Sequence, residues 1–218
     1  MNLQRIDVYA TPIWMIDIPE LEPYLELMIE KIRDLRSNAS TDLKQKSNRK
    51  GWHSDLDILE YKEFSFLKNT LIKSSKSCFD DYGIDSGDRV FSFSGWANVH
   101  DIGGHNTSHV HPGSWLSGTI YLKTPEGAGK LFFEDPRQSM RMEHIPLKKD
   151  LPKIPVRSRG RFHVHPKACR LIMFPSWFEH GVEAAECDER ISVAFNITPI
   201  QLRKMQHEAL EKIKNNCI

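Results

Sequence analysis

The sequence predicts a mainly β fold in which helices pack against an antiparallel β sandwich or barrel. Two amphipathic helical patterns lie near the start of the chain, and after Gly83 the pattern changes to short β-like runs separated by turn residues. A length of 218 residues suits one domain with a substantial core and is short for two. We therefore expect a single domain, with mostly helical support over residues 1–88, a β core over residues 89–199 and a closing C-terminal helix over residues 200–218.

Two segments have the period of an amphipathic helix. In the first, from Leu21 to Leu35, apolar residues recur at spacings of four and three, with charged side chains on the other face. The second runs from Tyr61 to Tyr82, and Gly83 is expected to end it. The residues expected to face inward are Leu21, Leu25, Met28, Ile32 and Leu35 in the first helix, and Phe64, Leu67, Leu71, Cys78 and Phe79 in the second.

The remaining chain divides into polar segments and short β-like runs. The stretch Arg36–Gly51 is polar and basic with almost nothing to bury, so we expect a mobile loop. The long segment Pro136–Gly160 has no clear period, and we expect a functional lid or a partly disordered loop. The predicted strands are Val90–His100, Ser117–Lys123, Lys130–Glu134, Arg161–His165, Arg170–Phe174 and Arg190–Thr198.

Composition narrows the class of protein. Thirty Lys and Arg against 29 Asp and Glu leave no excess positive charge, so nucleic acid is not indicated as a partner. The four cysteines are far apart without a CxxC pair, as expected for reduced thiols of a cytoplasmic protein. The N-terminal residues lack the apolar stretch of a signal peptide, and no apolar run approaches the roughly 20 residues that span a bilayer. We expect a cytoplasmic protein without a membrane segment.

A pair of histidines supplies half of a candidate metal site. His109 and His111 are separated by one residue, so on a strand both imidazoles would project from the same face, just before a turn at Pro112–Gly113. An HxH pair alone is a weak signal for a metal.

The other half is expected from His180, which follows an apolar strand and the short aromatic turn after Pro175. In a barrel, His180 can return to the mouth and meet the HxH pair. Three protein ligands leave open positions on the metal, as oxygen chemistry requires. By itself His180 is better explained as a partly buried, hydrogen-bonded histidine, and only its combination with the HxH pair favours a metal ligand.

The strand that begins at Arg190 carries a polar face. Arg190, Ser192 and Asn196 alternate with an apolar face, which is the period of a strand. A guanidinium fixed inside a barrel suits a bidentate grip on a carboxylate, and the Ser192 hydroxyl can add a hydrogen bond. The alternative is an exposed arginine at the strand start, paired with Glu189 or Asp188.

Together these motifs resemble the 2-oxoglutarate/iron(II)-dependent oxygenase family of bacteria and their phages. The resemblance covers most of the chain from Gly51 to Thr198. It rests on HVHPGSWLSG from His109, LFFEDPR from Leu131, FPSW from Phe174 with His180, WANV from Trp96 and GWHS from Gly51.

The resemblance implies a double-stranded β-helix (jelly-roll, cupin-like) core. His109 and His180 would be metal ligands, and Arg190 with Ser192 would hold the distal carboxylate of 2-oxoglutarate. The family pattern usually has an acidic residue two positions after the first histidine, where this sequence has His111. We therefore expect a three-histidine set, with Asp135 as the alternative to His111.

The implied reaction is oxidative decarboxylation of 2-oxoglutarate coupled to hydroxylation of a substrate that the sequence does not identify. Its cofactors would be Fe(II), 2-oxoglutarate as co-substrate with dioxygen, and ascorbate as reductant. Tyr121 and Asn98 lie on predicted strands and could reach the co-substrate, although a core tyrosine and a turn-capping asparagine explain them equally well. We assign no catalytic acid or base. The oligomeric state is open, a homodimer being one option.

Two other functions fit part of the pattern. A cupin-type dioxygenase with three histidines would not use 2-oxoglutarate; Gly103 and the HxH pair fit the opening of the cupin motif, but the glutamate expected shortly afterwards is absent. A β-sandwich binding module without catalysis is the second alternative. Structural zinc sites have four ligands, usually with Cys, and no Cys lies near the HxH pair in sequence.

Overall fold

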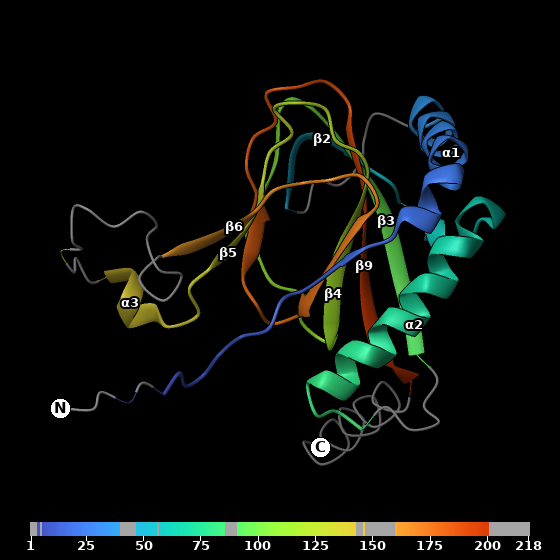
Figure 1. Ribbon diagram of the computed structural model, residues 1–218. Helices are drawn as coiled ribbons and strands as arrows, with labels where there is room; N and C mark the ends of the chain where they lie inside the picture. Colours follow the sequence, from blue (N-terminus) through green and yellow to red (C-terminus); the bar gives the residue numbers. More distant parts are fainter. Residues whose placement is uncertain are drawn as a thin grey trace, which may run out of the picture.

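The fold is a curled antiparallel sheet with two helices against one side (Figure 1). The computed structural model describes residues 4, 6–39, 47–55, 57–85, 91–142, 146 and 160–200. Nine described strands form one sheet in the order β1-β7-β4-β9-β3-β8-β5-β6, with β2 paired to β3. The strands are β1 Trp14–Asp17, β2 Asn48–His53, β3 Phe91–His109, β4 Leu116–Lys123, β5 Leu131–Glu134, β6 Arg161–Val164, β7 Arg170–Pro175, β8 His180–Val182 and β9 Arg190–Pro199.

Both predicted helices are confirmed. A 3₁₀ helix over Pro19–Tyr24 continues into α1 (Leu25–Ser37). The 3₁₀ turns Ile58–Glu60 and Lys62–Phe64 lead into α2 (Ser65–Asp81), and the five apolar residues predicted to face inward there are all buried. Gly83 has φ +76°, and the Ile84 N–H donates to the Phe79 carbonyl at 2.8 Å, so the helix ends in a glycine cap. Among the described residues, no helix combines the length and apolarity that a bilayer crossing requires.

The six predicted strands are all present, and three further strands were not predicted. The expected loop over Arg36–Gly51 is wrong at its end, because Asn48–His53 is β2 and pairs with β3. The other two are β1, which extends the sheet beyond β7, and β8, which carries His180. Within the predicted lid, Gln138–Met142 forms the short helix α3, and most of the remainder lies outside the described residues. The expected C-terminal helix also falls outside them, apart from Ile200.

The strand β3 belongs to both halves of the curl. Its first part, Phe91–His100, pairs with β9 on the side that the helices cover. Its last part pairs with β8, where Asn106 lies opposite Val182 and His109 opposite His180. One strand therefore connects the helix-covered half to the half formed by β8, β5 and β6.

Apolar side chains pack on both faces of the sheet. Successive residues of β7 alternate between two clusters, with Leu171 and Met173 in one and Ile172 and Phe174 in the other. The first cluster includes the buried side chains of α1 and α2 and lies between helices and sheet. The second lies inside the curl and consists of Tyr121, Leu131, Phe133, Val164, Ile172, Phe174, Phe178 and Val182. Residues that share the face of Tyr121 therefore point into the curl.

Gly118 in β4 permits the close approach of its neighbours, and we expect Gly118→Ala to destabilise the fold. A Cβ there would lie 2.5 Å from the Ile172 carbonyl oxygen and 2.5 Å from Cζ of Phe195. Overpacking of this kind typically costs about 1–3 kcal/mol in the free energy of unfolding, which urea denaturation measures. Gly160→Ala is the matched control, because a Cβ there meets nothing within 4 Å. Equal unfolding midpoints for the two variants would contradict the prediction.

Candidate metal centre and anion pocket

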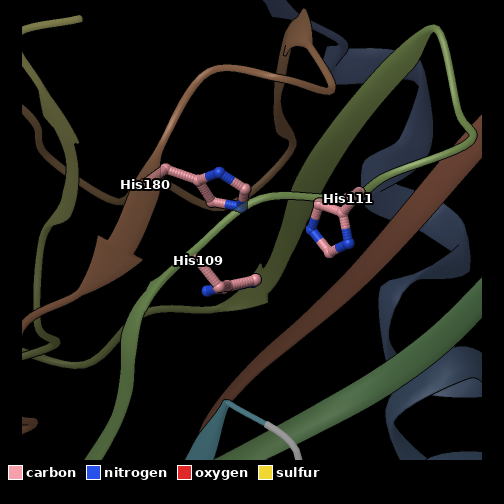
Figure 2. A group of neighbouring side chains, drawn as sticks. All are labelled: His109, His111 and His180. Atoms are coloured by element: carbon pink, nitrogen blue, oxygen red, sulfur yellow. The ribbon is translucent and has the colours of Figure 1, made fainter.

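Three histidine side chains converge at one end of the curl (Figure 2). One ligand nitrogen from each of His109, His111 and His180 can be chosen so that all lie within 4.8 Å of one another. His109 and His180 are cross-strand partners on β3 and β8, with ring centroids 4.5 Å apart. The ring of His111 lies 4.9 Å from that of His109 and 5.1 Å from that of His180.

Two of the imidazoles are oriented by the backbone. Nδ1 of His109 lies 2.7 Å from the Thr107 carbonyl oxygen, and Nδ1 of His180 lies 2.8 Å from that of Phe178. A carbonyl oxygen accepts only, so each Nδ1 carries the proton and each Nε2 keeps its lone pair. This arrangement is typical of metal-binding histidines.

The surroundings keep the same two imidazoles neutral. His180 is buried, its ring 4.5 Å from Phe174, and burial together with the His109 ring lowers its pKa to about 3. Burial also lowers the pKa of His109. Neutral imidazoles are the form that binds a metal ion.

The position of His111 has a different cause from the one expected. β3 ends at His109, so strand alternation does not place His111. The His111 N–H instead donates to the Ser176 carbonyl at 3.0 Å, which fastens the turn after β3 to the turn after β7. Its ring lies 5.7 Å from that of Trp96, on the inner face of β3.

Asp135, the expected alternative to His111, does not join this group. Its carboxylate accepts hydrogen bonds from the Arg137 backbone N–H at 2.9 Å and from the Arg137 guanidinium at 2.6 and 3.0 Å. Among the described residues, no carboxylate meets the three histidines within the same spacing.

Arg190 lies inside the curl and is 2% exposed. Nη2 of Arg190 lies 3.3 Å from Oγ of Ser192, and its guanidinium carbon lies 5.5 Å from the Tyr121 ring centroid. Ser192 stands directly opposite Asn98 of β3 on one side and Tyr121 of β4 on the other. The four residues predicted to contact a co-substrate therefore gather on one inner face.

This anion pocket (Asn98, Tyr121, Arg190 and Ser192) contains buried polar atoms without a protein partner. Within the described part of the chain they are Oδ1 of Asn98, the Tyr121 hydroxyl, and Nε and Nη1 of Arg190. Burial lowers the pKa of Arg190 and raises that of Tyr121. A buried guanidinium with free donors lacks the counter-charge that such a group requires, and a carboxylate would supply it.

The ion pair considered as an alternative for Arg190 is made by other residues. Glu189 accepts hydrogen bonds from Arg33 of α1 at 2.7 Å through both Nε and Nη2, and it also pairs with Lys123. Glu189 has φ +56°, so the chain turns sharply before it enters β9. The carboxylate stays outside with α1 while Arg190 enters the interior.

One buried residue of this region was missed in the sequence. His100 lies on β3 directly opposite Arg190 and is fully buried. The signal was available, because His100 is two residues beyond Asn98 and therefore shares its face of the predicted strand.

A comparison with protein families finds a match over the middle of the chain. Residues 94–196, which include every predicted site residue, match the family described as "Putative 2OG-Fe(II) oxygenase". The chain matches none of the curated proteins with which it was compared.

Several solved structures share the fold at low sequence identity. A prolyl-4-hydroxylase from Pseudomonas putida has 13% identity and a TM-score of 0.61, over 88% of this chain and 95% of that one. The epimerase SnoN from nogalamycin biosynthesis, solved with Fe3+, alpha-ketoglutarate and nogalamycin RO, has 14% identity and a TM-score of 0.60, over 87% and 79%. HygX from Streptomyces hygroscopicus, solved with nickel, 2-oxoglutarate and hygromycin B, has 12% identity and a TM-score of 0.53, over 87% and 84%. The predicted double-stranded β-helix fold is confirmed.

Proposed function

The chain carries a 2OG-Fe(II) oxygenase domain at residues 94–196, and from this premise we propose that it couples oxidative decarboxylation of 2-oxoglutarate to hydroxylation of a second substrate. The observation that carries the proposal is the buried guanidinium of Arg190, whose Nε and Nη1 have no partner among the described residues. A dioxygenase that works without a dicarboxylate has no use for a buried cation in that position.

His109, His111 and His180 would hold the iron. Each offers a ligand nitrogen toward the others, and in His109 and His180 the proton stays on Nδ1, at a backbone carbonyl. Bound iron would supply the activation of dioxygen and the redox chemistry of the 2-oxo acid. Three protein ligands leave room for the co-substrate and dioxygen.

Arg190 and Ser192 would hold the distal carboxylate of 2-oxoglutarate, and Tyr121 and Asn98 would line the pocket beside it. The aromatic side chains Phe133, Phe174 and Phe178, which pack near His180, would exclude water from the metal end. No side chain is required to take a proton from the substrate, and we assign no general base.

The proposal predicts that the iron(II)-reconstituted protein, with ascorbate as reductant, forms succinate from 2-oxoglutarate in air. Uncoupled turnover makes this measurable without the substrate, by chromatographic quantification of succinate. The zinc(II)-loaded protein is the matched control, because zinc has no redox chemistry. Iron binding without 2-oxoglutarate consumption or affinity would contradict the proposal and favour a three-histidine dioxygenase of the cupin type. Because SnoN is an epimerase, the oxidised product of any candidate substrate must be identified before the reaction is called a hydroxylation.

A further inference from the structure

We propose that His100 closes the deep end of the anion pocket, contacts the distal carboxylate beside Arg190, and so selects 2-oxoglutarate over dicarboxylates with a longer chain. The inference rests on the proposed function, since it concerns the pocket that would take 2-oxoglutarate. It adds a residue that limits the chain length of the co-substrate the pocket accepts. The sequence motifs did not indicate this residue.

The register of the strands places His100 at the far end of the pocket. Along the inner face of β3, Trp96 lies nearest the metal ligands, 5.7 Å from the His111 ring, followed by Asn98 and then His100. Each such step is about 6.5 Å. Arg190 starts opposite His100, and its guanidinium reaches back to Ser192, which stands opposite Asn98. A carboxylate held by this guanidinium therefore has His100 on the side away from the metal ligands.

The fold makes specific room for the imidazole. A Cβ on Gly51 would lie 2.4 Å from Cδ2 of His100, and a Cβ on Gly104 would lie 3.0 Å from the same atom. Nε2 of His100 lies 2.8 Å from the side-chain oxygen of Asn48 on β2. The ring is thus held in one orientation by the Asn48 side chain and by the close backbone at Gly51 and Gly104. A longer ligand cannot displace the ring without moving β2.

The remaining nitrogen of the ring is available to a ligand. Nδ1 of His100 is buried and without a partner among the described residues, as are Nε and Nη1 of Arg190. Burial, and next the charge of Arg190, lower the pKa of His100 to about 3, so the imidazole is neutral and Arg190 supplies the positive charge. Opposite the Asn48 amide oxygen, Nε2 carries the proton and Nδ1 does not. When the Asn48 amide is flipped, its NH2 group donates to Nε2, so the proton moves to Nδ1 and His100 donates to the carboxylate.

Ligand selectivity tests the role in length selection. The zinc(II)-loaded wild type and His100→Ala are titrated calorimetrically with 2-oxoglutarate and with 2-oxoadipate, and His163→Ala, a half-exposed histidine paired with Glu183, is the control. We expect the wild type and the control to prefer 2-oxoglutarate. His100→Ala should lose about tenfold or more in affinity for it, as for other hydrogen bonds to charged groups, and gain affinity for 2-oxoadipate. An unchanged ratio of the two affinities overturns the inference. A wild type that binds neither acid overturns the proposed function as well.

A second measurement is made on the wild type, and a variant serves only to assign the signal. In the zinc(II)-loaded wild type with 15N-labelled histidine, we expect saturation with 2-oxoglutarate to move the Nδ1 resonance of His100 to the range of a protonated ring nitrogen. The signals of His163 should stay unchanged, and His100→Asn assigns the resonance. If 2-oxoglutarate binds but both ring nitrogens of His100 keep their shifts, His100 is an ordinary core histidine and the inference is wrong.

Discussion

Replacing Arg190 with leucine is expected to weaken 2-oxoglutarate binding by at least about thirtyfold while leaving metal affinity unchanged. The guanidinium is fully inside the protein, and Ser192 is the only residue to which a hydrogen bond from it is described. The lost contact would be a charge-assisted bond in a site that excludes water, where such bonds are strongest. Calorimetric titration of the zinc(II)-loaded variant with 2-oxoglutarate measures the change.

The same substitution separates ligand binding from folding. In the unliganded protein a buried cation without a counter-charge costs free energy, so Arg190→Leu should not lower the midpoint of thermal unfolding and is expected to raise it. Arg170→Leu is the control, because Arg170 lies on β7, which β4 separates from β9, and makes a bidentate pair with Asp17 of β1 at 2.7 and 3.0 Å. Equal 2-oxoglutarate affinities for the two variants would contradict the role of Arg190.

Replacing His180 with alanine is expected to reduce metal affinity by more than the roughly 10–100-fold loss that follows removal of a hydrogen-bond partner of a ligand. His180 would supply one of three ligands, and within the described part of the chain no other His, Cys, Asp or Glu belongs to the cluster and could substitute for it. Competition with a chromophoric chelator for zinc(II) or iron(II) measures the affinity. His163→Ala should bind metal as the wild type does, since His163 pairs with Glu183 outside the cluster.

The third ligand is tested by two further variants. His111→Asp supplies the carboxylate that the family pattern has at this position, so we expect it to bind metal, whereas His111→Ala should not. Asp135→Asn should bind as the wild type, because the Asp135 carboxylate is held by Arg137. Loss of metal in Asp135→Asn together with retention in His111→Ala would identify Asp135 as the ligand instead.

The helices and the central strands could be predicted because their apolar periods are long. The stripe from Leu21 to Leu35 and the alternation over Arg190–Asn196 each extend over several repeats. The candidate site residues were found from local motifs, and the structure brings seven of the eight together at the two ends of one interior, with Asp135 apart. That these residues bind iron and 2-oxoglutarate remains the proposal.

The strands that escaped prediction lack such repeats. Asn48–His53 contains Arg49, Lys50 and Gly51, and its place in the sheet depends on pairing with β3, not on its own side chains. The strand β8 has three residues, too few for any period to show. Gly51 in a polar stretch is typical of a loop, yet here it is required by the His100 ring against it. Only a cross-strand contact explains it, and such contacts are not visible in a single sequence.

Because β3 belongs to both halves of the curled sheet, the order of folding and metal binding can be inferred from its pairing. β3 pairs with β8 and β9, which follow it only after a long stretch of chain, so the sheet depends on contacts between distant segments. Folds of this kind form slowly compared with helical proteins, because loops must close before the contacts stabilise them. During synthesis, His109 and His111 emerge well before His180, and they cannot meet it until the curl closes. The apolar clusters close that curl without any metal contact. Metal loading is therefore expected to follow folding, and removal of the metal by a chelator should leave a folded apoprotein, unlike a small zinc finger.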